Sequence, residues 1–198
     1  MEQLCIFNLS KDCEYVVLSY VWGRTAQVRL LRENYGNLNQ PFVLRVLLDT
    51  LARTIADAIT VVRRPGKRFL WVDSLCLIQD SPEDLAVQIR HMNIIYGCAS
   101  LTTVAAAGSD SGAGFAGLRP NSRKILDIDQ EIEGIPVITT LPSFADSIVD
   151  SVWESRGWKM QGKFFRSICS YLLSTHDVGC TPLSRLTSPL FIHLYISK

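Results

Sequence analysis

FLWVDSLCLIQDSPED, residues 69–84, joins a short apolar strand to a well-marked helix start. Aromatic and aliphatic residues fill most of Phe69–Asp73, which predicts a buried strand that ends at an acidic residue. Ser81 can cap a helix, Pro82 suits its first position, and the acids at 83 and 84 favour its first turn. A strand that leads into a helix is the building unit of α/β folds.

The segments before this stretch predict a second strand and helix. Tyr15–Tyr20 is β-branched and aromatic, which is typical of a buried strand. A short strand is expected at Gln27–Leu31. Thr54 and Asp57 have the spacing of a capping box and predict a helix start, and Pro65 with its following glycine ends that helix.

The segments after this stretch complete the pattern. Leu85, Ile89, Met92 and Tyr96 predict one apolar stripe on a single helix. Leu101–Ala105 then predicts a third strand. The order strand–helix–strand–helix–strand predicts an α/β domain with a largely parallel central sheet.

The rest of the chain carries weaker patterns. We interpret the glycine-rich residues 108–117 as a flexible connection, because they contain no complete phosphate-binding motif. Two strands are expected at Lys124–Ile128 and Ile135–Thr139, and a helix at Phe164–Leu173. Thr181–Lys198 has no clear cap or period, so an irregular C-terminal segment is expected.

Composition excludes several classes of protein. The 198 residues are 47% hydrophobic, which argues against wholesale disorder, and the net charge of +1 gives no electrostatic case for nucleic-acid binding. The sequence contains no run of about 20 apolar residues, so no membrane span is expected. The N-terminus lacks the pattern of a signal peptide, so a cytoplasmic location is expected.

The cysteines and histidines predict no metal site. Six cysteines and three histidines are spread without a C-x-x-C pair or other close ligand spacing. Cys76 follows a strand end, but no histidine can be placed beside it as a base, so we interpret it as a packed core thiol.

Three aspartates deserve separate interpretations. Asp73 ends a strand, where an acid of a parallel sheet can face the ligand crevice, and a purely structural role is equally consistent with its position. For Asp57 we expect a helix cap and for Asp80 a turn cap.

Three blocks of sequence together resemble the heterokaryon incompatibility (HET) domain of filamentous fungi. They are LSYVWG at 18–23, TIADAI at 54–59 with FLWVDSLCLIQD at 69–80, and a third block from Met92 to Ala106. The resemblance covers about residues 15–158. The positions that match the family's motifs are Ser19, Tyr20, Trp22, Gly23, Asp57, Trp71, Asp73, Cys76, Gln79, Asp80, Tyr96, Arg156 and Trp158.

The resemblance implies a fold and a domain division. HET domains are thought to be distantly similar to TIR domains, which implies a flavodoxin-like three-layer sandwich. A HET-like domain is expected over residues 1–165, followed by an atypical tail at 166–198. The loss of both pattern and resemblance in the tail suggests a truncated or mis-spliced gene model.

The resemblance also implies a function. HET domains induce cell death when genetically different hyphae fuse, so we expect an effector of fungal self/non-self recognition. Its expected partners are like domains or a fungal recognition protein, and no cofactor is expected.

Two alternatives to this function remain. The first is a TIR-like enzyme that cleaves NAD as a substrate, with Ser19, Trp22 and Asp73 lining its pocket. Gly162 stands where the family often has a glutamate, and the absence of that acid counts against the NAD-cleaving alternative. The second is an inert fragment whose uncovered core would aggregate.

Overall fold

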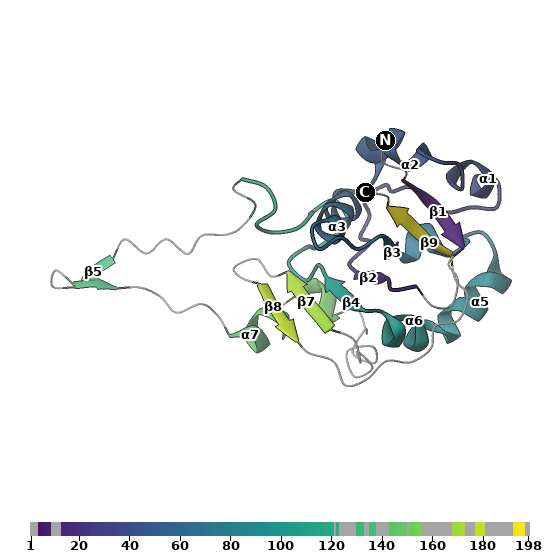
Figure 1. Ribbon diagram of the computed structural model, residues 1–198. Coiled ribbons are helices and arrows are strands. Elements are labelled where there is room, and N and C mark those ends of the chain that lie inside the picture. Colours follow the sequence, from purple (N-terminus) through teal and green to yellow (C-terminus); the bar gives the residue numbers. More distant parts are fainter. Residues whose placement is uncertain are drawn as a thin grey trace.

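A computed structural model of the chain describes residues 4–8, 13–120, 122, 130–132, 135–137, 143–149, 151–155, 168–172, 177–180 and 192–196. A seven-stranded sheet runs through it in the order β1-β9-β3-β2-β4-β7-β8 (Figure 1). Its strands are β1 Leu4–Asn8, β2 Val16–Ser19, β3 Phe69–Trp71, β4 Leu101–Val104, β7 Ile168–Leu172, β8 Asp177–Cys180 and β9 Ile192–Ile196.

The helices connect and cover these strands. They are α1 Tyr35–Leu38, α2 Val43–Val46, α3 Arg53–Arg63, α4 Asp73–Cys76, α5 Pro82–Arg90, α6 Met92–Cys98, α7 Phe144–Val149 and α8 Val152–Ser155, with a short 3-10 turn η1 at Leu48–Thr50. A separate two-stranded hairpin pairs β5 Gln130–Ile132 with β6 Ile135–Val137. The chain therefore has the mixed α/β architecture that its pattern predicts.

The four central strands are parallel. β2 pairs in parallel with β3 on one side and with β4 on the other, and β4 pairs in parallel with β7. The outer pairs β1–β9, β3–β9 and β7–β8 are antiparallel. The predicted parallel sheet is thus confirmed at the centre, and antiparallel strands, which the pattern did not indicate, extend it on both sides.

Alternate residues of the central strands build two cores on opposite faces of the sheet. Val16 and Leu18 of β2 pack in one cluster with the apolar side of α3, including Ile55 and Ile59. Val17 belongs to the other cluster, with residues of α6. Side chains that alternate along a strand point to opposite faces, so the centre of the sheet lies between α3 and α6.

The second predicted helix is broken in two. Ser81 caps α5 as expected, since its hydroxyl accepts from the backbone N–H of Asp84 at 3.4 Å. His91 then ends α5 and begins α6. The break interrupts the single stripe, so Met92 is buried while the Ile89 side chain is 62% exposed. The prediction of one continuous apolar stripe was wrong, because it requires an unbroken helix.

Other local expectations also differ from the structure. Residues 27–31 form no strand. Part of the segment predicted as a helix at Phe164–Leu173 is strand β7, and the segment predicted as irregular, Thr181–Lys198, contributes β9. Strand β8 lies between these two segments and was not predicted. Ile135–Val137 is a strand as expected, but its partner is Gln130–Ile132. The segment 124–128 lies outside the described residues.

Candidate functional site

Polar side chains gather where β2 and β3 end. Trp22 follows β2 and Asp73 follows β3, and the two strands run in the same direction. Parallel strands therefore bring both residues to one edge of the sheet, where ligand sites of α/β folds lie. We call Tyr20, Trp22, Asp73 and Ser74 the Asp73 cluster.

The Trp22–Asp73 contact is the centre of this cluster. The indole N–H of Trp22 donates to both carboxylate oxygens of Asp73, at 3.0 and 2.9 Å. The backbone N–H of Ser74 donates to the same carboxylate at 2.7 Å. The guanidinium group of Arg29 lies over the Trp22 ring, with its central carbon 5.3 Å from the ring centroid. Hydrogen bonds and a cation–π contact thus fix the indole in place.

Tyr20 and Ser74 extend the network. The Tyr20 hydroxyl is a hydrogen-bond donor to two acceptors. They are Ser74 Oγ at 3.0 Å and Gln27 Oε1 at 3.1 Å. Ser74 is fully buried and Tyr20 nearly so. Buried polar groups with this many partners lock their side chains into one arrangement.

Burial perturbs the acid at the centre. Desolvation raises the pKa of Asp73 from 3.8 to about 6, against the hydrogen bonds from Trp22, Ser74 and Tyr20, which lower it. Desolvation also raises the pKa of Tyr20 well above its ordinary value, and the negative charge of Asp73 adds to that shift. A carboxyl group with a pKa near neutrality can exchange a proton under physiological conditions.

Ser19 lies beneath the cluster rather than in an open pocket. Its side chain is buried, and its hydroxyl accepts from the indole N–H of Trp153 in α8 at 2.9 Å. Tyr96 of α6 is buried beside it; desolvation raises the pKa of Tyr96, the Asp73 charge raises it further, and a hydrogen bond with Ser19 opposes the rise. The structure thus brings Ser19, Trp22 and Asp73 to the same edge, with Ser19 enclosed.

Gln79 and Asp80 bind a segment distant in sequence. The amide of Gln79 donates to the carbonyls of Asp73 and Leu77, at 2.9 and 3.0 Å. Its backbone N–H donates to the carbonyl of Leu30 at 2.8 Å. Asp80 accepts from the backbone N–H of Arg32 at 2.9 Å, so it anchors this neighbouring segment instead of capping its own turn.

Asp57 joins α3 to the glycine-rich loop. One carboxylate oxygen accepts from the backbone N–H of Phe115 at 2.8 Å, and the other accepts from Arg119 at 2.7 Å. Thr54 accepts from the backbone N–H of Gly114 at 3.1 Å. No side chain caps α3. The expected capping role of Asp57 was therefore wrong, because the loop 111–119 takes both side chains as hydrogen-bond acceptors.

The glycine-rich loop packs closely on the motif residues. Gly114 has a φ of +75°, and a Cβ there would lie 2.6 Å from Asp57 Oδ2. Gly23 has a φ of +64°, and a Cβ there would lie 2.2 Å from the Cβ of Asp110. Both positions therefore need glycine for backbone conformation and for close approach. The expected flexible connection is instead a loop that is hydrogen-bonded to Asp57 and to the Trp22 carbonyl and packed against Gly23.

Cys76 and Trp71 belong to the core. Burial raises the pKa of Cys76 to about 12, and its sulfur accepts from the backbone N–H of Val72 at 3.3 Å. Such a thiol is inert, which confirms its interpretation as a packed core residue. Trp71 is buried edge-on against Tyr96, with ring centroids 6.0 Å apart.

Some expected site residues lie outside the described residues. They are Arg156, Trp158 and Gly162. Conversely, sequence reasoning did not single out Gln27, Arg29 and Trp153 as neighbours of the motif residues. Gln27 and Arg29 were assigned to a strand that does not form, and no local pattern links Trp153 to Ser19. Ser74 could have been found from the sequence, because it directly follows Asp73 inside the FLWVDSLCLIQD block.

Two absences hold for the described part of the chain. Its histidines, cysteines and acids form no group of three or more that could hold a metal ion. None of its helices is long and apolar enough to cross a membrane.

Comparison with known proteins gives the family. The model of the heterokaryon incompatibility protein (HET) family matches residues 15–162. The chain belongs to the HET family. This match contains the whole Asp73 cluster and the Asp57 contacts, so the HET blocks are the residues that build the edge of the sheet.

One curated relative adds detail. Heterokaryon incompatibility protein 6, OR allele, of Neurospora crassa is 34% identical to this HET chain over 106 residues. That match covers 50% of this chain and 15% of the relative, so the chain spans a small part of its length. No solved structure matches.

Proposed function

We propose that this HET-family chain is a cell-death-inducing effector module of fungal self/non-self recognition. The family match over residues 15–162 and the similarity to a Neurospora heterokaryon incompatibility protein support this role. The observation that carries the proposal furthest is the Trp22–Asp73 contact, because it ties the two most distinctive blocks of the family pattern into one site.

The proposed mechanism is association with a like domain or a fungal recognition protein in the cytoplasm. Three segments, 20–32, 73–80 and 106–119, meet at the carboxyl edge of the parallel strands, and segment 20–32 is hydrogen-bonded to each of the other two. A rigid set of loops at one edge presents a constant surface to a partner at little ordering cost. The Asp73 charge at its centre is proposed to be necessary for the death response.

A TIR-like NAD-cleaving activity is the second candidate, and one observation favours it. The parallel strands lie in the order β3-β2-β4-β7, which is the order of the first four strands of flavodoxin-like folds. In such folds ligands bind at the carboxyl edge, where Asp73 has a pKa of about 6. In this candidate function Trp22 would contact NAD at the same edge, Ser19 would lie enclosed beneath it, and NAD would be the substrate rather than a cofactor.

Viability of a fungal host after induced expression tests the leading proposal. The native chain is compared with Gly162→Glu, which restores the acid that the family often carries. Death with the native chain supports an effector that does not need this acid. Death only with Gly162→Glu points to a chain disabled at this position, and survival with both contradicts the proposal and favours an inert fragment.

Nicotinamide release separates the two candidate functions. Purified chain is incubated with NAD, and free nicotinamide is measured by chromatography, with Asp73→Asn as the matched variant. The effector proposal predicts no release above buffer. Release by the native chain that is lost in Asp73→Asn would establish the enzymatic alternative instead.

A further inference from the structure

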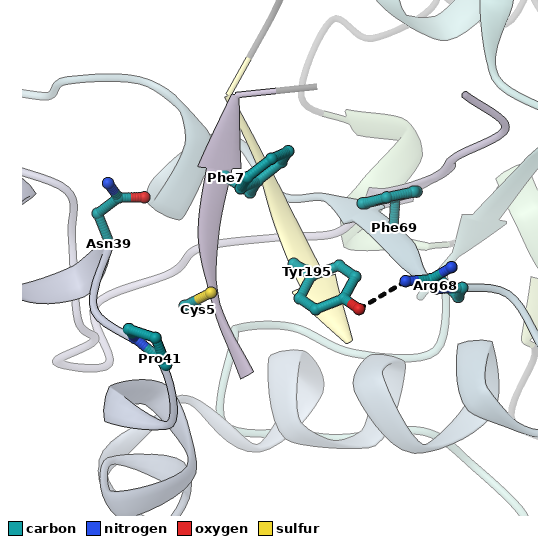
Figure 2. A pocket seen from close by; sticks show the side chains of 7 residues that line it. All are labelled: Cys5, Phe7, Asn39, Pro41, Arg68, Phe69 and Tyr195. Carbon is teal, nitrogen blue, oxygen red and sulfur yellow. Dashed lines mark hydrogen bonds between the residues drawn. The ribbon is translucent and has the colours of Figure 1, made fainter. Parts of the chain in front are cut away.

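A pocket of about 470 Å³ lies at the other end of β3 from the Asp73 cluster. Arg68 precedes β3, whereas Asp73 follows it. Cys5, Phe7, Phe69, Tyr195 and Arg68 line the pocket (Figure 2). Its volume lies within the range of about 300–1,000 Å³ that is usual for small-molecule sites.

Strand register explains why these side chains meet. Cys5 of β1 lies opposite Tyr195 of β9, and Tyr195 lies opposite Phe69 of β3, so the three form a row across adjacent strands. Phe7 shares their face, because it lies two residues from Cys5 along β1. β1 is the last strand of the sheet on this side, and Asn39 and Pro41 form the wall beyond it.

Arg68 gives this aromatic surface a fixed positive charge. Its guanidinium carbon lies 5.2 Å from the ring centroid of Tyr195 and 5.9 Å from that of Phe69. The guanidinium also donates to the Tyr195 hydroxyl, as the dashed line in Figure 2 marks. Within the described residues Arg68 forms no ion pair, whereas the neighbouring Lys67 pairs with Glu14 at 2.6 Å.

We propose that this pocket binds a small planar aromatic carboxylate. The aromatic ring would pack among Phe7, Phe69 and Tyr195, which offer ring edges and faces on one surface. The carboxylate would accept from the guanidinium N–H groups of Arg68 that Tyr195 does not use, in the planar geometry that suits this pair. This site is separate from the Asp73 cluster and does not depend on the proposed function.

Two matched probes test the proposal on the full chain. 2-Naphthoate carries the ring and the negative charge, and 2-naphthalenemethanol carries the same ring without the charge. Isothermal titration should give naphthoate an affinity about tenfold or more above that of the alcohol, the usual scale for one charge-assisted hydrogen bond. Equal affinities, or no naphthoate binding at millimolar concentration, would overturn the proposal.

Variants assign the binding to this pocket. Arg68→Gln, at an exposed side chain, should reduce naphthoate binding to the level of the alcohol and leave alcohol binding unchanged. Tyr195→Phe keeps the ring but removes the hydroxyl that positions Arg68, so it should weaken naphthoate alone. Arg90→Gln on α5 is the control and should change neither probe. Naphthoate binding that Arg68→Gln leaves intact would refute the site.

Discussion

Asp73 combines a partly buried position with donors that favour its charged form. Trp22 and the Ser74 backbone stabilise the carboxylate, yet removal from water dominates and raises its pKa to about 6. The side chain therefore binds a proton more readily in the folded state than in the unfolded chain. This difference makes the stability of the protein depend on pH in a predictable direction.

The first prediction concerns Asp73→Asn. Because the folded-state pKa of Asp73 lies above its unfolded value, its contribution to stability is lost as pH rises from about 4 to about 6. The gap between 3.8 and about 6 corresponds to at most about 3 kcal/mol. Asparagine does not titrate, so the free energy of unfolding of Asp73→Asn should rise relative to that of wild type across this pH interval. Urea unfolding of both proteins at each pH measures this difference.

The difference between the two proteins is the quantity to follow, since other carboxyl groups titrate in both. Asp49→Asn, at an exposed acid of η1, is the control and should parallel wild type. A difference between Asp73→Asn and wild type that stays constant from pH 4 to 6.5 would refute the raised pKa.

A second prediction removes the indole donor. Trp22→Phe keeps an aromatic ring but deprives the Asp73 carboxylate of its only side-chain N–H within the described residues. Loss of a hydrogen bond to a charged group costs about 1.5–3 kcal/mol. The variant should be destabilised by that amount at pH 7, and the destabilisation should be smaller in an Asp73→Asn background. Equal destabilisation in both backgrounds would show that Trp22 does not stabilise the fold through the Asp73 charge, and would contradict the prediction.

Hydrogen bonds between α3 and the glycine-rich loop hold the loop against the helix. Asp57 is buried on α3 and accepts from both Phe115 and Arg119. Gly114 approaches it so closely that no side chain fits between them. The loop is therefore an integral part of the domain rather than a connection over its surface.

A third prediction follows for Asp57→Asn. The variant loses the ion pair and weakens the acceptor for Phe115, so about 1.5–3 kcal/mol of stability should be lost. Amide hydrogen exchange of residues 111–118 should accelerate more than that of β2. Asp49→Asn, at an exposed acid of η1, is the matched control and should change neither. Unchanged exchange in the loop of Asp57→Asn would contradict the anchoring role.

Elements with their own local signals could be predicted from the sequence. Ser81 with Pro82 marks the start of α5, and the apolar runs at β2, β3 and β4 locate the central strands. The break at His91 could not be predicted, because the helical spacing of apolar residues in the sequence continues across it. Asp57 was misassigned because its partners lie about sixty residues away, beyond any local pattern.

For the whole molecule, strand β9 joins β1 to the parallel centre of the sheet. β9 lies between β1 and β3, and its residues Leu194 and Ile196 are buried in the main core. Its sequence has no cap and no clear period, so its place depends on pairing with strands far away in the chain. Such pairing is set by tertiary context and leaves little local trace.

A fourth prediction tests this placement. Leu194→Ala should cost about 2–5 kcal/mol, the range for truncating a fully buried leucine. Val46→Ala, at a side chain 80% exposed on α2, should stay within about 0.5 kcal/mol of wild type. Both values come from urea unfolding of the full chain. A Leu194→Ala protein as stable as Val46→Ala would contradict the insertion of β9 in the sheet.

Survival of a fungal host tests the central claim most directly, with the native chain, Asp73→Asn and the control Asp49→Asn induced to equal protein levels. Asp73→Asn is informative because it should remain folded, so a loss of killing would report on the Asp73 charge itself. We predict that the native chain and Asp49→Asn kill the host and that Asp73→Asn does not. Killing by Asp73→Asn, or survival with the native chain, would contradict a death effector centred on the Asp73 cluster.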